Sequence, residues 1–329
     1  MTKRSLRHWE HRIGRRVHLR DLHILLTVAQ SGSMVRAAHE LSMSQPAVSK
    51  AIATLEHTLG IRLLDRTAQG VEPTRYGVAL LRRGAAVFDE LRQGVSEIEY
   101  LSEQGVGELR VGYGEPLAIT LVTGVITTLT SRHPRLILHL RRADTIALDF
   151  RDLRERKVDL MVGRVAMPFR EEDLDANTIL QHSVVVVTGA QSPWVRRRKI
   201  KLADLVDEKW ILLPPELPES EWVASAFRSQ GLEPPRARVT TVSLHMRAAL
   251  LERGDFLSAF PPELLRHYPS IKALPVDLGL EPRPIAIVTL KNRTLTPAAE
   301  LFISELRTAA KASVTPGQPA PHCGRSIRP

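Results

Sequence analysis

Apolar residues recur at helical spacing in three consecutive short segments near the start of the chain. Ser33 and Ser44 stand immediately before the second and third segments, where a side-chain oxygen can cap the first turn of a helix. Pro46 falls in the first turn of the third segment, where its missing N–H costs nothing. The pattern predicts three amphipathic helices with the following apolar stripes: Leu22, Leu25, Leu26 and Ala29; Met34, Ala37, Ala38 and Leu41; Val48, Ile52, Leu55 and Leu59.

The second and third predicted helices are joined by a short turn, which is the arrangement of a helix-turn-helix over residues 33–52. Hydrogen-bonding side chains of the kind that reach base edges and phosphates lie on the outer face of the third helix: Gln45, Ser49, Lys50 and Thr54. A small helical hairpin with a polar outer face is the alternative interpretation. Helical spacing by itself does not distinguish the two.

A much longer helix is predicted from Thr74 to Ser102, with a length of about 44 Å at the usual rise per residue. Its apolar residues keep a spacing of three or four throughout: Val78, Leu81, Ala85, Phe88, Leu91, Val95, Ile98 and Leu101. An apolar stripe on a helix outside a compact domain usually pairs with another helix. Packing against the body of the same chain is the alternative.

Beyond residue 107 the pattern changes to alternating strands and helices, which predicts α/β sheets with ligand sites at the carboxyl ends of the strands. Strands are expected at 108–113, 136–140, 159–163, 183–188, 210–213, 238–242, 256–260 and 284–290, and helices at 117–132, 146–156, 221–230 and 244–253. From Ser313 the chain is rich in Pro, Gly and Ser without periodicity, which predicts a disordered tail over 313–329.

Several residues at the ends of the predicted strands are candidates for binding a small ligand. They follow the first strand, the second, the third and a later strand-to-helix junction: Glu115, Pro116 and Leu117; Thr145; Gly163 and Arg164; and Ser243. Each of them can equally be part of an ordinary helix start.

The excess of positive charge is concentrated at the amino end. The formal net charge is +10, and residues 1–83 hold 14 Lys and Arg against 6 Asp and Glu. A compact basic segment is typical of a nucleic-acid-binding module. Seven of these basic residues precede Asp21, so a solvated basic tail explains the charge equally well.

Residue patterns for catalysis, metal binding or cofactor binding are missing from the sequence. The single cysteine, Cys323, excludes a disulfide framework and a multi-cysteine metal site. Gly112-Tyr113-Gly114 lacks the third glycine of a dinucleotide turn, and the histidines show no metal-ligand spacing. We therefore expect no cofactor, no metal and no enzyme, although an enzyme remains the alternative class. The longest apolar stretch, Leu117–Leu129, is too short to span a membrane, and no signal peptide is evident, so a cytoplasmic location without membrane contact is expected.

The run LRDLHILLTVAQSGSMVRAAHELSMSQPAVSKAIATLEHTLGIRLLDRTAQGVEPTRYG resembles the DNA-binding domain of LysR-type transcriptional regulators. The resemblance implies a winged helix-turn-helix with its wing between Leu63 and Thr74. Carried over by position, it assigns DNA contacts to the following residues: Arg36, Ser44, Gln45, Pro46, Ser49, Lys50, Arg66 and Thr74. Ser33 and Thr54 are added as candidates from their places at the start of the second predicted helix and on the polar face of the third. Lys50 is an Arg in many relatives, and a point charge there favours phosphate contact over guanine recognition.

The same resemblance supplies expectations for the rest of the chain. It implies a winged helix-turn-helix over 19–77, a linker and dimerisation helix over 74–104, and an effector-binding domain over 107–312. That domain would have two lobes hinged like a periplasmic binding protein. The chain before His18 is longer and more basic than the family usually shows, so residues 1–18 are expected to form a basic extension. A solute-binding protein is the other alternative, and the basic amino-terminal module argues against it.

The segment from LLDRTAQG to SEIEYL is most similar to the galactose-binding-protein regulator branch of the family. The expected partners are double-stranded promoter DNA, RNA polymerase, a second copy in a dimer or tetramer, and a small effector. Sugars, sugar acids and small aromatic-derived acids remain open as effectors. Pro116 stands where relatives often have a hydroxyl residue, which departs from the usual way of binding a carboxylate.

Overall fold

The computed structural model describes residues 16–67, 70–103, 106–143, 149–217 and 220–313. The chain divides into two compact units, residues 1–95 and 96–329. Each unit is described by itself below. The expected basic extension lies almost wholly outside the described residues, as does the expected disordered tail beyond residue 313.

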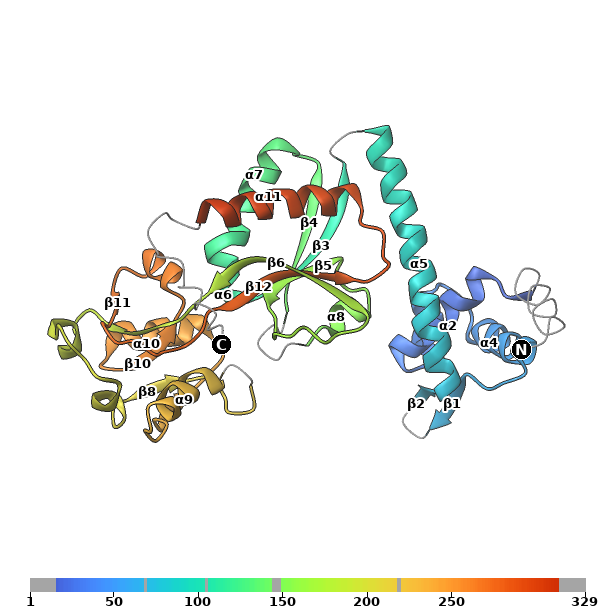
Figure 1. Ribbon diagram of the computed structural model, residues 1–329. Coiled ribbons are helices and arrows are strands. Elements are labelled where there is room, and N and C mark those ends of the chain that lie inside the picture. The colour runs from blue at the N-terminus through green and yellow to red at the C-terminus, as the bar shows by residue number, and fades with distance from the viewer. Residues whose placement is uncertain (1–15, 68–69, 104–105, 144–148, 218–219, 314–329) are drawn as a thin grey trace, which may run out of the picture. The chain divides into compact units, whose positions relative to one another are not determined.

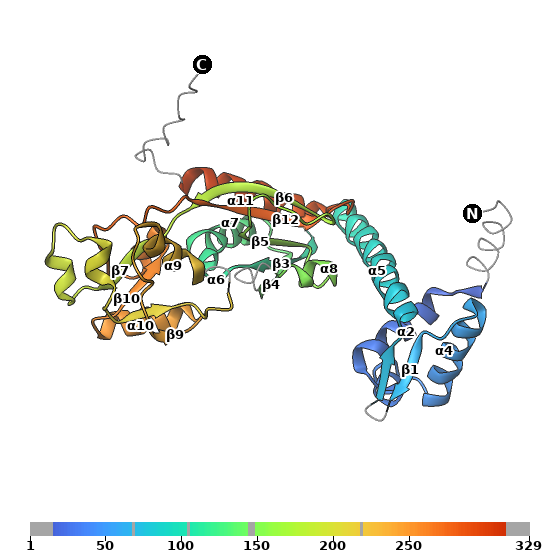
Figure 2. The same cartoon turned by 60° about the horizontal axis from the view of Figure 1, so that its bottom comes forward.

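The first unit is a winged helix-turn-helix followed by the start of a long helix (Figure 2). Its elements are α2 (Leu19–Ser31), α3 (Met34–Glu40), α4 (Gln45–Leu59), β1 (Leu64–Thr67), β2 (Gly70–Pro73) and α5 (Arg75–Ser102), which continues into the second unit. The two strands pair as an antiparallel ribbon, with Leu64 opposite Pro73. Ser33 and Ser44 cap α3 and α4, each accepting a backbone N–H in the first turn at 3.4 Å.

The core of this unit is built from the apolar faces of all three short helices and the base of the wing. The stripes predicted for α3 and α4 pack into it. The stripe predicted for α2 is rotated, because Ile24, Leu25 and Val28 fill the core. Leu22 and Leu26 instead approach α5, where a Cβ built on Gly84 would lie 3.9 Å from both side chains. α2 carries apolar residues on two faces. The position of α5 determines which of these faces packs into the core and which packs against α5.

The wing is fixed to the end of α2 by one close backbone approach. The N–H of Val71 donates to the carbonyl oxygen of Gly32 at 3.0 Å. Gly70 has a φ of 138°, and a Cβ at this position would lie 2.3 Å from the same oxygen. Only glycine fits there, because a side chain would collide with backbone and the conformation is strained for other residues.

The second unit contains two α/β lobes (Figure 1). Lobe 1 consists of β3 (Gly107–Tyr113), α6 (Glu115–Leu117), a π-helical turn (Ala118–Val122), α7 (Thr123–Arg132), β4 (Leu136–Arg142), α8 (Arg151–Arg154), β5 (Leu160–Arg164), β6 (Leu174–His182), β12 (Arg283–Leu290) and α11 (Pro297–Ser313). Lobe 2 consists of β7 (Val185–Gly189), β8 (Trp210–Leu212), α9 (Ser220–Ser229), β9 (Ala237–Thr240), α10 (Leu244–Arg253), β10 (Leu257–Phe260) and β11 (Ile271–Ala273), with short 3-10 turns at Pro193–Arg196, Leu202–Leu205 and Pro262–His267.

The sheet of lobe 1 has the strand order β4-β3-β5-β12-β6. β3, β4 and β5 run parallel, whereas β12 runs antiparallel to both of its neighbours. Leu160 and Val162 of β5 pack on one side with α7 and α11, and Met161 packs on the other side with α8. Figure 1 shows α7 and α11 on one side of the sheet and α8 on the other. Because helices cover both faces of the sheet, the sequence of β5 is almost continuously apolar.

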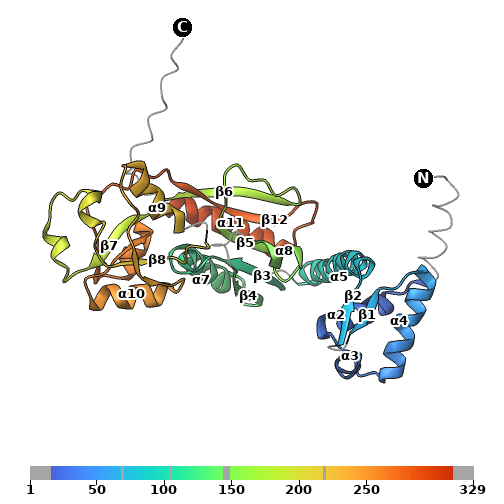
Figure 3. The same ribbon diagram turned by 90° about the horizontal axis from the view of Figure 1, so that it is seen from below.

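Lobe 2 repeats this layered arrangement with the strand order β11-β7-β10-β8-β9. Trp210 of β8 packs on the side of α9, and its neighbour Ile211 packs on the side of α10. Figure 3 shows α9 and α10 on opposite faces of this sheet. The chain passes from lobe 1 to lobe 2 after His182 and returns at Arg283, so two neighbouring strand ends connect the lobes.

Several parts of the second unit differ from the predicted pattern. The helix α11 was not among the predicted helices. β6 and β11 are additional strands, and both lie at a sheet edge, where one neighbour is missing and polar residues are tolerated. The helix expected over 146–156 contains α8, which is only four residues long, and residues 144–148 lie outside the described part.

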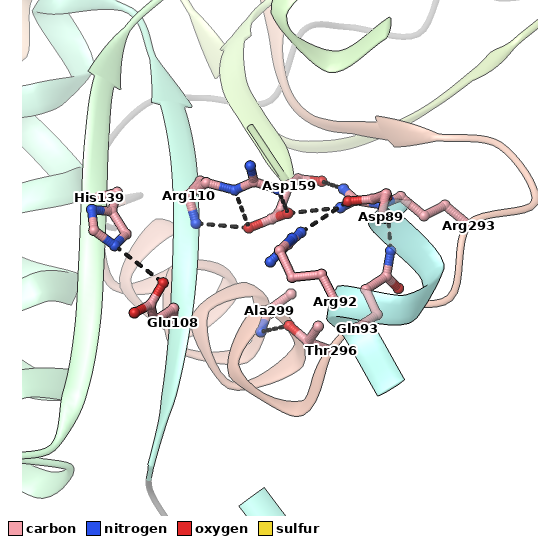
Figure 4. A network of polar contacts seen from close by, with 10 residues as sticks. All are labelled: Asp89, Arg92, Gln93, Glu108, Arg110, His139, Asp159, Arg293, Thr296 and Ala299. Carbon is pink, nitrogen blue, oxygen red and sulfur yellow. Dashed lines mark hydrogen bonds and ion pairs between the residues drawn. The ribbon is translucent and has the colours of Figure 1, made fainter. Parts of the chain in front are cut away.

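A buried ionic group joins the start of β5 to β3 and to the loop before α11 (Figure 4). Asp159 accepts the backbone N–H of Arg110 at 2.8 Å and the guanidinium of Arg293 at 2.7 Å. The side chains of Asp159 and Arg293 are 4% and 2% exposed. Removing one partner from such a buried pair would strongly destabilise lobe 1.

Candidate functional site

The outer face of α4 presents polar side chains on a rigid helix. Ser44, Gln45, Pro46, Lys50 and Thr54 are exposed, while the opposite face of the same helix is buried in the core. The Nε2 atom of Gln45 donates to Oγ of Ser49 at 3.2 Å, which orients the exposed amide. The hydroxyl of Thr54 donates to the carbonyl oxygen of Lys50 at 2.8 Å, so it is engaged within the helix.

The remaining residues assigned to DNA lie around this helix. Arg36 on α3 and Arg66 on the wing are exposed. Ser33 is half-buried and caps α3. Thr74 has a structural use, because its hydroxyl donates to the carbonyl oxygen of Arg62 at 2.9 Å and accepts the N–H of Gly77 at 3.0 Å. Exposed arginines that the sequence argument did not name flank the wing at Arg62 and Arg75.

The predicted apolar stripe of α5 continues as a row of exposed side chains toward the end of the helix. Val95 is 55% exposed, Ile98 is 64% exposed and Leu101 is 75% exposed. Apolar residues at this spacing on a polar helix match the pattern of a helix that pairs with a second helix.

A cavity lies between the two lobes of the second unit, at the carboxyl ends of β3, β5, β8, β9 and β10. Glu115, Pro116 and Arg164 line it from lobe 1. Lobe 2 contributes apolar residues from its strand ends, together with Trp222 of α9 and Arg247 of α10. This position agrees with the expectation that ligand sites of α/β sheets form beyond the carboxyl ends of strands.

Of the seven residues predicted from the strand ends, Glu115, Pro116 and Arg164 line the cavity. Leu117 is buried in the hydrophobic core of lobe 1. Ser243 caps α10, accepting the N–H of Met246 at 3.2 Å. The other two are Gly163, which is buried within β5, and Thr145, which lies outside the described residues.

Positive charge and burial dominate the electrostatics of the cavity. Burial, and then the nearby charge of Arg164, lower the pKa of His182 to about 3, so its imidazole is neutral at physiological pH. Burial, followed by repulsion from Arg164, lowers the pKa of Arg247 to about 10, while Glu115 raises it. Arg247 therefore remains charged at neutral pH although it is only 8% exposed.

Trp222 of lobe 2 contacts two guanidinium groups of lobe 1. The Cζ atoms of Arg164 and Arg283 lie 4.8 Å and 4.6 Å from the centre of its ring system. The ring of His182 lies 6.2 Å away, centre to centre. These contacts join α9 to the ends of β5, β6 and β12.

His182, Trp222 and Arg247 were not predicted from the sequence as ligand residues. Arg247 carried a readable signal, because it falls in the apolar stripe formed by Leu244, Ala248 and Leu251 on α10. A charged residue is almost never fully buried unless it is paired, so an arginine within an apolar stripe indicates a special environment. Trp222 carried no such signal, since it continues the ordinary apolar stripe of α9.

The described ranges contain no group of three or more His, Cys, Asp or Glu residues that could hold a metal ion. Over the same residues, no helix combines the length and the apolar character needed to cross a bilayer.

Comparison with known proteins gives two family matches. The model of the bacterial regulatory helix-turn-helix protein, lysR family, matches residues 19–78, and the model of the LysR substrate binding domain matches residues 102–311. The chain is 30% identical over 301 residues to the HTH-type transcriptional regulator GbpR of Azospirillum brasilense, covering 90% of this chain and 87% of that protein. It is 25% identical over 278 residues to the regulator TdcA of Escherichia coli, covering 84% and 88%.

Solved structures of similar fold are full-length regulators. CbnR, a LysR family transcriptional regulator, has a TM-score of 0.62 at 22% identity, covering 89% of this chain and 99% of that chain. A full-length OxyR variant from Pseudomonas aeruginosa has a TM-score of 0.65 at 23% identity, covering 89% and 98%. At this level of identity the likeness establishes a shared fold.

Proposed function

Because the chain belongs to the LysR family of DNA-binding transcriptional regulators, we propose that it reads operator DNA with α4 and answers to a small effector bound between its lobes. The family consists of regulators with an effector-binding domain. The main support for this proposal is the row of exposed polar side chains at the start of α4. The opposite face of this helix is buried in the core.

In the proposed complex, α4 enters the major groove with its first turns. The amide of Gln45 can donate to and accept from a single base edge, which is the pairing typical of adenine. Lys50 contributes charge at a phosphate, because a single ammonium lacks the forked geometry that recognises guanine in two places. Arg36 and Arg66 extend the phosphate contact on either side, and the wing positions the second of them.

A second copy of the chain pairs through the exposed stripe of α5 in this proposal. Pairing would bury Val95, Ile98 and Leu101, and each fully buried side chain of this size contributes about 1.5–3 kcal/mol. Two copies of α4 would then read two half-sites of an inverted repeat, because the symmetry of a dimer is repeated in its operator. Assembly of two dimers into a tetramer, recruitment of RNA polymerase and a cytoplasmic location are part of the same proposal.

The effector acts in this scheme by preferring one arrangement of the lobes. A ligand shifts an equilibrium only as far as its affinities for the two states differ. Contacts from both lobes to one ligand would supply that difference, since opening the lobes would break half of them.

Fluorescence anisotropy on the DNA upstream of the protein's own gene tests the DNA half of the proposal. The titration is repeated with a scrambled competitor and at salt concentrations from about 50 to about 300 mM. We expect binding that survives the competitor and weakens steeply with salt, because phosphate contacts release counterions. Equal affinity for both DNAs would contradict sequence-specific reading by α4 at that site, and no binding at low salt would contradict DNA binding altogether.

A further inference from the structure

Five basic side chains lie close together in the sequence on the surface of lobe 2, in the connection between β7 and β8. All five are exposed, and none of them lines the cavity between the lobes. Figures 2 and 3 show the chain after β7, in yellow-green, at the end of lobe 2 that lies away from lobe 1. This basic run consists of Arg196, Arg197, Arg198, Lys199 and Lys201.

The backbone that carries the basic run is fixed to the core of lobe 2. Trp194 precedes the run, Ile200 lies within it and Leu202 follows it, and all three pack in the same apolar cluster. The N–H of Arg197 donates to the carbonyl oxygen of Trp194 at 3.1 Å. The basic run is therefore a fixed feature of the surface, and a partner that meets it does not have to order the backbone first.

The positive charge of the basic run is not neutralised by nearby acids. Among the residues that the structure describes, no carboxylate forms an ion pair with any of its five members. Elsewhere in lobe 2, Lys209 is paired with Asp255 at 3.0 Å. Arg197 stacks on Trp194, with 4.5 Å between Cζ and the ring centre, which uses the face of the guanidinium. The N–H groups in the guanidinium plane stay available for a forked contact to a phosphate.

The distribution of charge over lobe 2 is strongly uneven. Residues 183–282 hold 13 Lys and Arg against 12 Asp and Glu, and the basic run supplies five of the 13. The rest of the lobe is therefore net negative. A cluster of like charge on such a body produces a local positive potential, which attracts polyanions.

The dimensions of the basic run match the phosphate spacing of duplex DNA. Its six positions, 196–201, span at most about 20 Å. One strand of B-DNA carries about six phosphates over the same length. Several side chains of the run can therefore meet phosphates of one duplex at the same time.

The side chains next to the basic run argue against other polyanionic surfaces. Single-stranded nucleic acid binds through bases that stack on exposed aromatic rings. The aromatic residue here is Trp194, which is 9% exposed. Insertion into a membrane surface needs a broad apolar face. Val195, at 36%, is the only large apolar residue that is exposed among residues 193–202, all of which the structure describes.

The chain itself brings DNA to lobe 2 at a high local concentration. It belongs to a family of DNA-binding regulators, and lobe 2 is covalently tethered to the helix-turn-helix unit. A second site on a tethered module binds at an effective concentration of up to about millimolar, so a contact that is weak by itself still adds affinity. An acidic protein would have to be recruited from solution without this advantage.

We propose that lobe 2 makes a second contact with duplex DNA, in which the basic run binds phosphates without regard to sequence. The contact goes beyond operator recognition by α4, because it belongs to the effector-binding domain. It adds affinity and carries no base information, as phosphate contacts do in general.

Fluorescence anisotropy with the full-length protein tests this contact. The DNA is a duplex of random sequence of about 60 base pairs, titrated at salt concentrations from about 50 to about 300 mM. The run variant combines Arg196→Gln, Arg198→Gln, Lys199→Gln and Lys201→Gln, and it keeps Arg197 because that side chain packs on Trp194. The control variant removes the same charge from four exposed positions of lobe 2 outside the run, by Arg236→Gln, Arg238→Gln, Arg253→Gln and Lys272→Gln.

We expect the run variant to reduce the slope of log affinity against log salt by about two to three, because each lost phosphate contact accounts for about 0.9. Its affinity at about 100 mM salt should fall about 10- to 100-fold. The control variant should keep the slope of the wild type and lose less than about threefold in affinity, since a spread charge makes no phosphate contact.

Photo-cross-linking locates the contact directly. Benzoylphenylalanine in place of Lys199 should cross-link to the duplex on irradiation, whereas the same group in place of Lys272, on β11, should not. A general attraction between a basic protein and DNA would not distinguish the two positions.

Equal salt slopes for the run variant and the control variant would overturn the proposed contact, and so would the absence of a cross-link from position 199. Polyglutamate and vesicles containing phosphatidylglycerol are titrated in parallel. If either binds as tightly as the duplex at the same salt, and loses this affinity in the run variant, the basic run does not select DNA and the proposal is wrong.

Failure of the regulator function gives a different result. Wild-type protein that binds no duplex DNA at low salt would contradict both proposals. Wild-type binding that the run variant leaves unchanged would contradict only the contact made by lobe 2. Thermal unfolding shows whether the variants fold, and if the run variant does not, the cross-link decides.

Discussion

The guanidinium of Arg164 lies over the indole ring of Trp222, with 4.8 Å between Cζ and the ring centre. Arg164 ends β5 in lobe 1, and Trp222 lies in the first turn of α9 in lobe 2, so this stacking joins the two lobes. Arg283 lies 4.6 Å from the same ring system. The cavity is thus bordered by a cation–aromatic contact that can persist only while the lobes stay together.

We expect this contact to contribute measurably to the stability of the second unit. A double-mutant cycle with Arg164→Met and Trp222→Leu should give a coupling free energy of about 0.5–2 kcal/mol, the range for partly desolvated cation–π pairs. Urea unfolding of the full-length protein measures it. The control cycle pairs Arg164→Met with Trp194→Leu, whose ring is stacked with Arg197 instead, and its effects should be additive. Equal coupling in both cycles would contradict a specific contact.

Buried His182 should make the stability of the protein depend on pH on the acid side of neutrality. Its folded pKa of about 3 lies below the ordinary value of 6.5 because of burial and of Arg164. The unfolded chain therefore binds a proton that the folded chain does not, and stability falls as the pH decreases from about 6.5 toward about 3. Between pH 7 and pH 5 this residue alone accounts for a loss of about 2 kcal/mol.

Unfolding free energies of His182→Gln, measured over the same pH range, should show a correspondingly smaller loss. His245→Gln, at an exposed histidine of α10, is the control and should follow the wild type. Parallel pH profiles for wild type and His182→Gln would contradict the assignment.

Gln45 and Lys50 should affect DNA binding in different ways. Gln45→Ala removes a base-reading amide, so it should reduce discrimination between operator variants more than overall affinity, with about 1–3 kcal/mol lost at the base it reads. Lys50→Ala removes a phosphate contact, so it should weaken binding to all sequences and reduce the salt slope by about one. Anisotropy with single-base operator variants distinguishes the two. A uniform loss with Gln45→Ala would remove it from base recognition.

The exposed stripe of α5 should hold two copies of the chain together. Val95 and Ile98 are 55% and 64% exposed, and replacing both by Glu would bring four like charges into a paired interface. Analytical ultracentrifugation should show the double variant as a monomer at concentrations where the wild type is a dimer. Glu90→Lys changes an exposed charge on the same helix and is the control. A double variant that stays dimeric would place the interface elsewhere.

The turn between α4 and the wing depends on one carboxylate. Oε1 of Glu56 accepts the backbone N–H groups of Leu63 at 2.7 Å and Leu64 at 3.1 Å. Glu56→Ala leaves both partly buried donors without this acceptor, and we expect a loss of about 1–3 kcal/mol in the stability of the first unit. Differential scanning calorimetry measures it, with Glu72→Ala, at an exposed position of β2, as the control. Equal melting of both variants would contradict this role.

The sequence alone determined the local features of the amino-terminal module. The stripes of α3 and α4, their serine caps and the long helix are all encoded by contacts between residues three or four positions apart, and the structure confirms them. The stripe of α2 was predicted only in part: Leu25 lies in the core, whereas Leu22 and Leu26 approach α5, whose position the sequence did not supply. Alternation of strands and helices likewise predicted the α/β lobes, since burial of a strand on both faces leaves a continuous apolar run.

The tertiary structure decided which strand ends meet at the cavity. β12 inserts between β5 and β6, and two connections pass between the lobes, so residues far apart in the chain come together. Arg247 and Trp222 lie on different helices, and each falls within the stripe of buried residues of its own helix. The spacing of apolar residues along the chain predicts whether a side chain is buried. Which residues surround it depends on contacts between residues far apart in the sequence, and these are set by the strand order and by the two connections between the lobes.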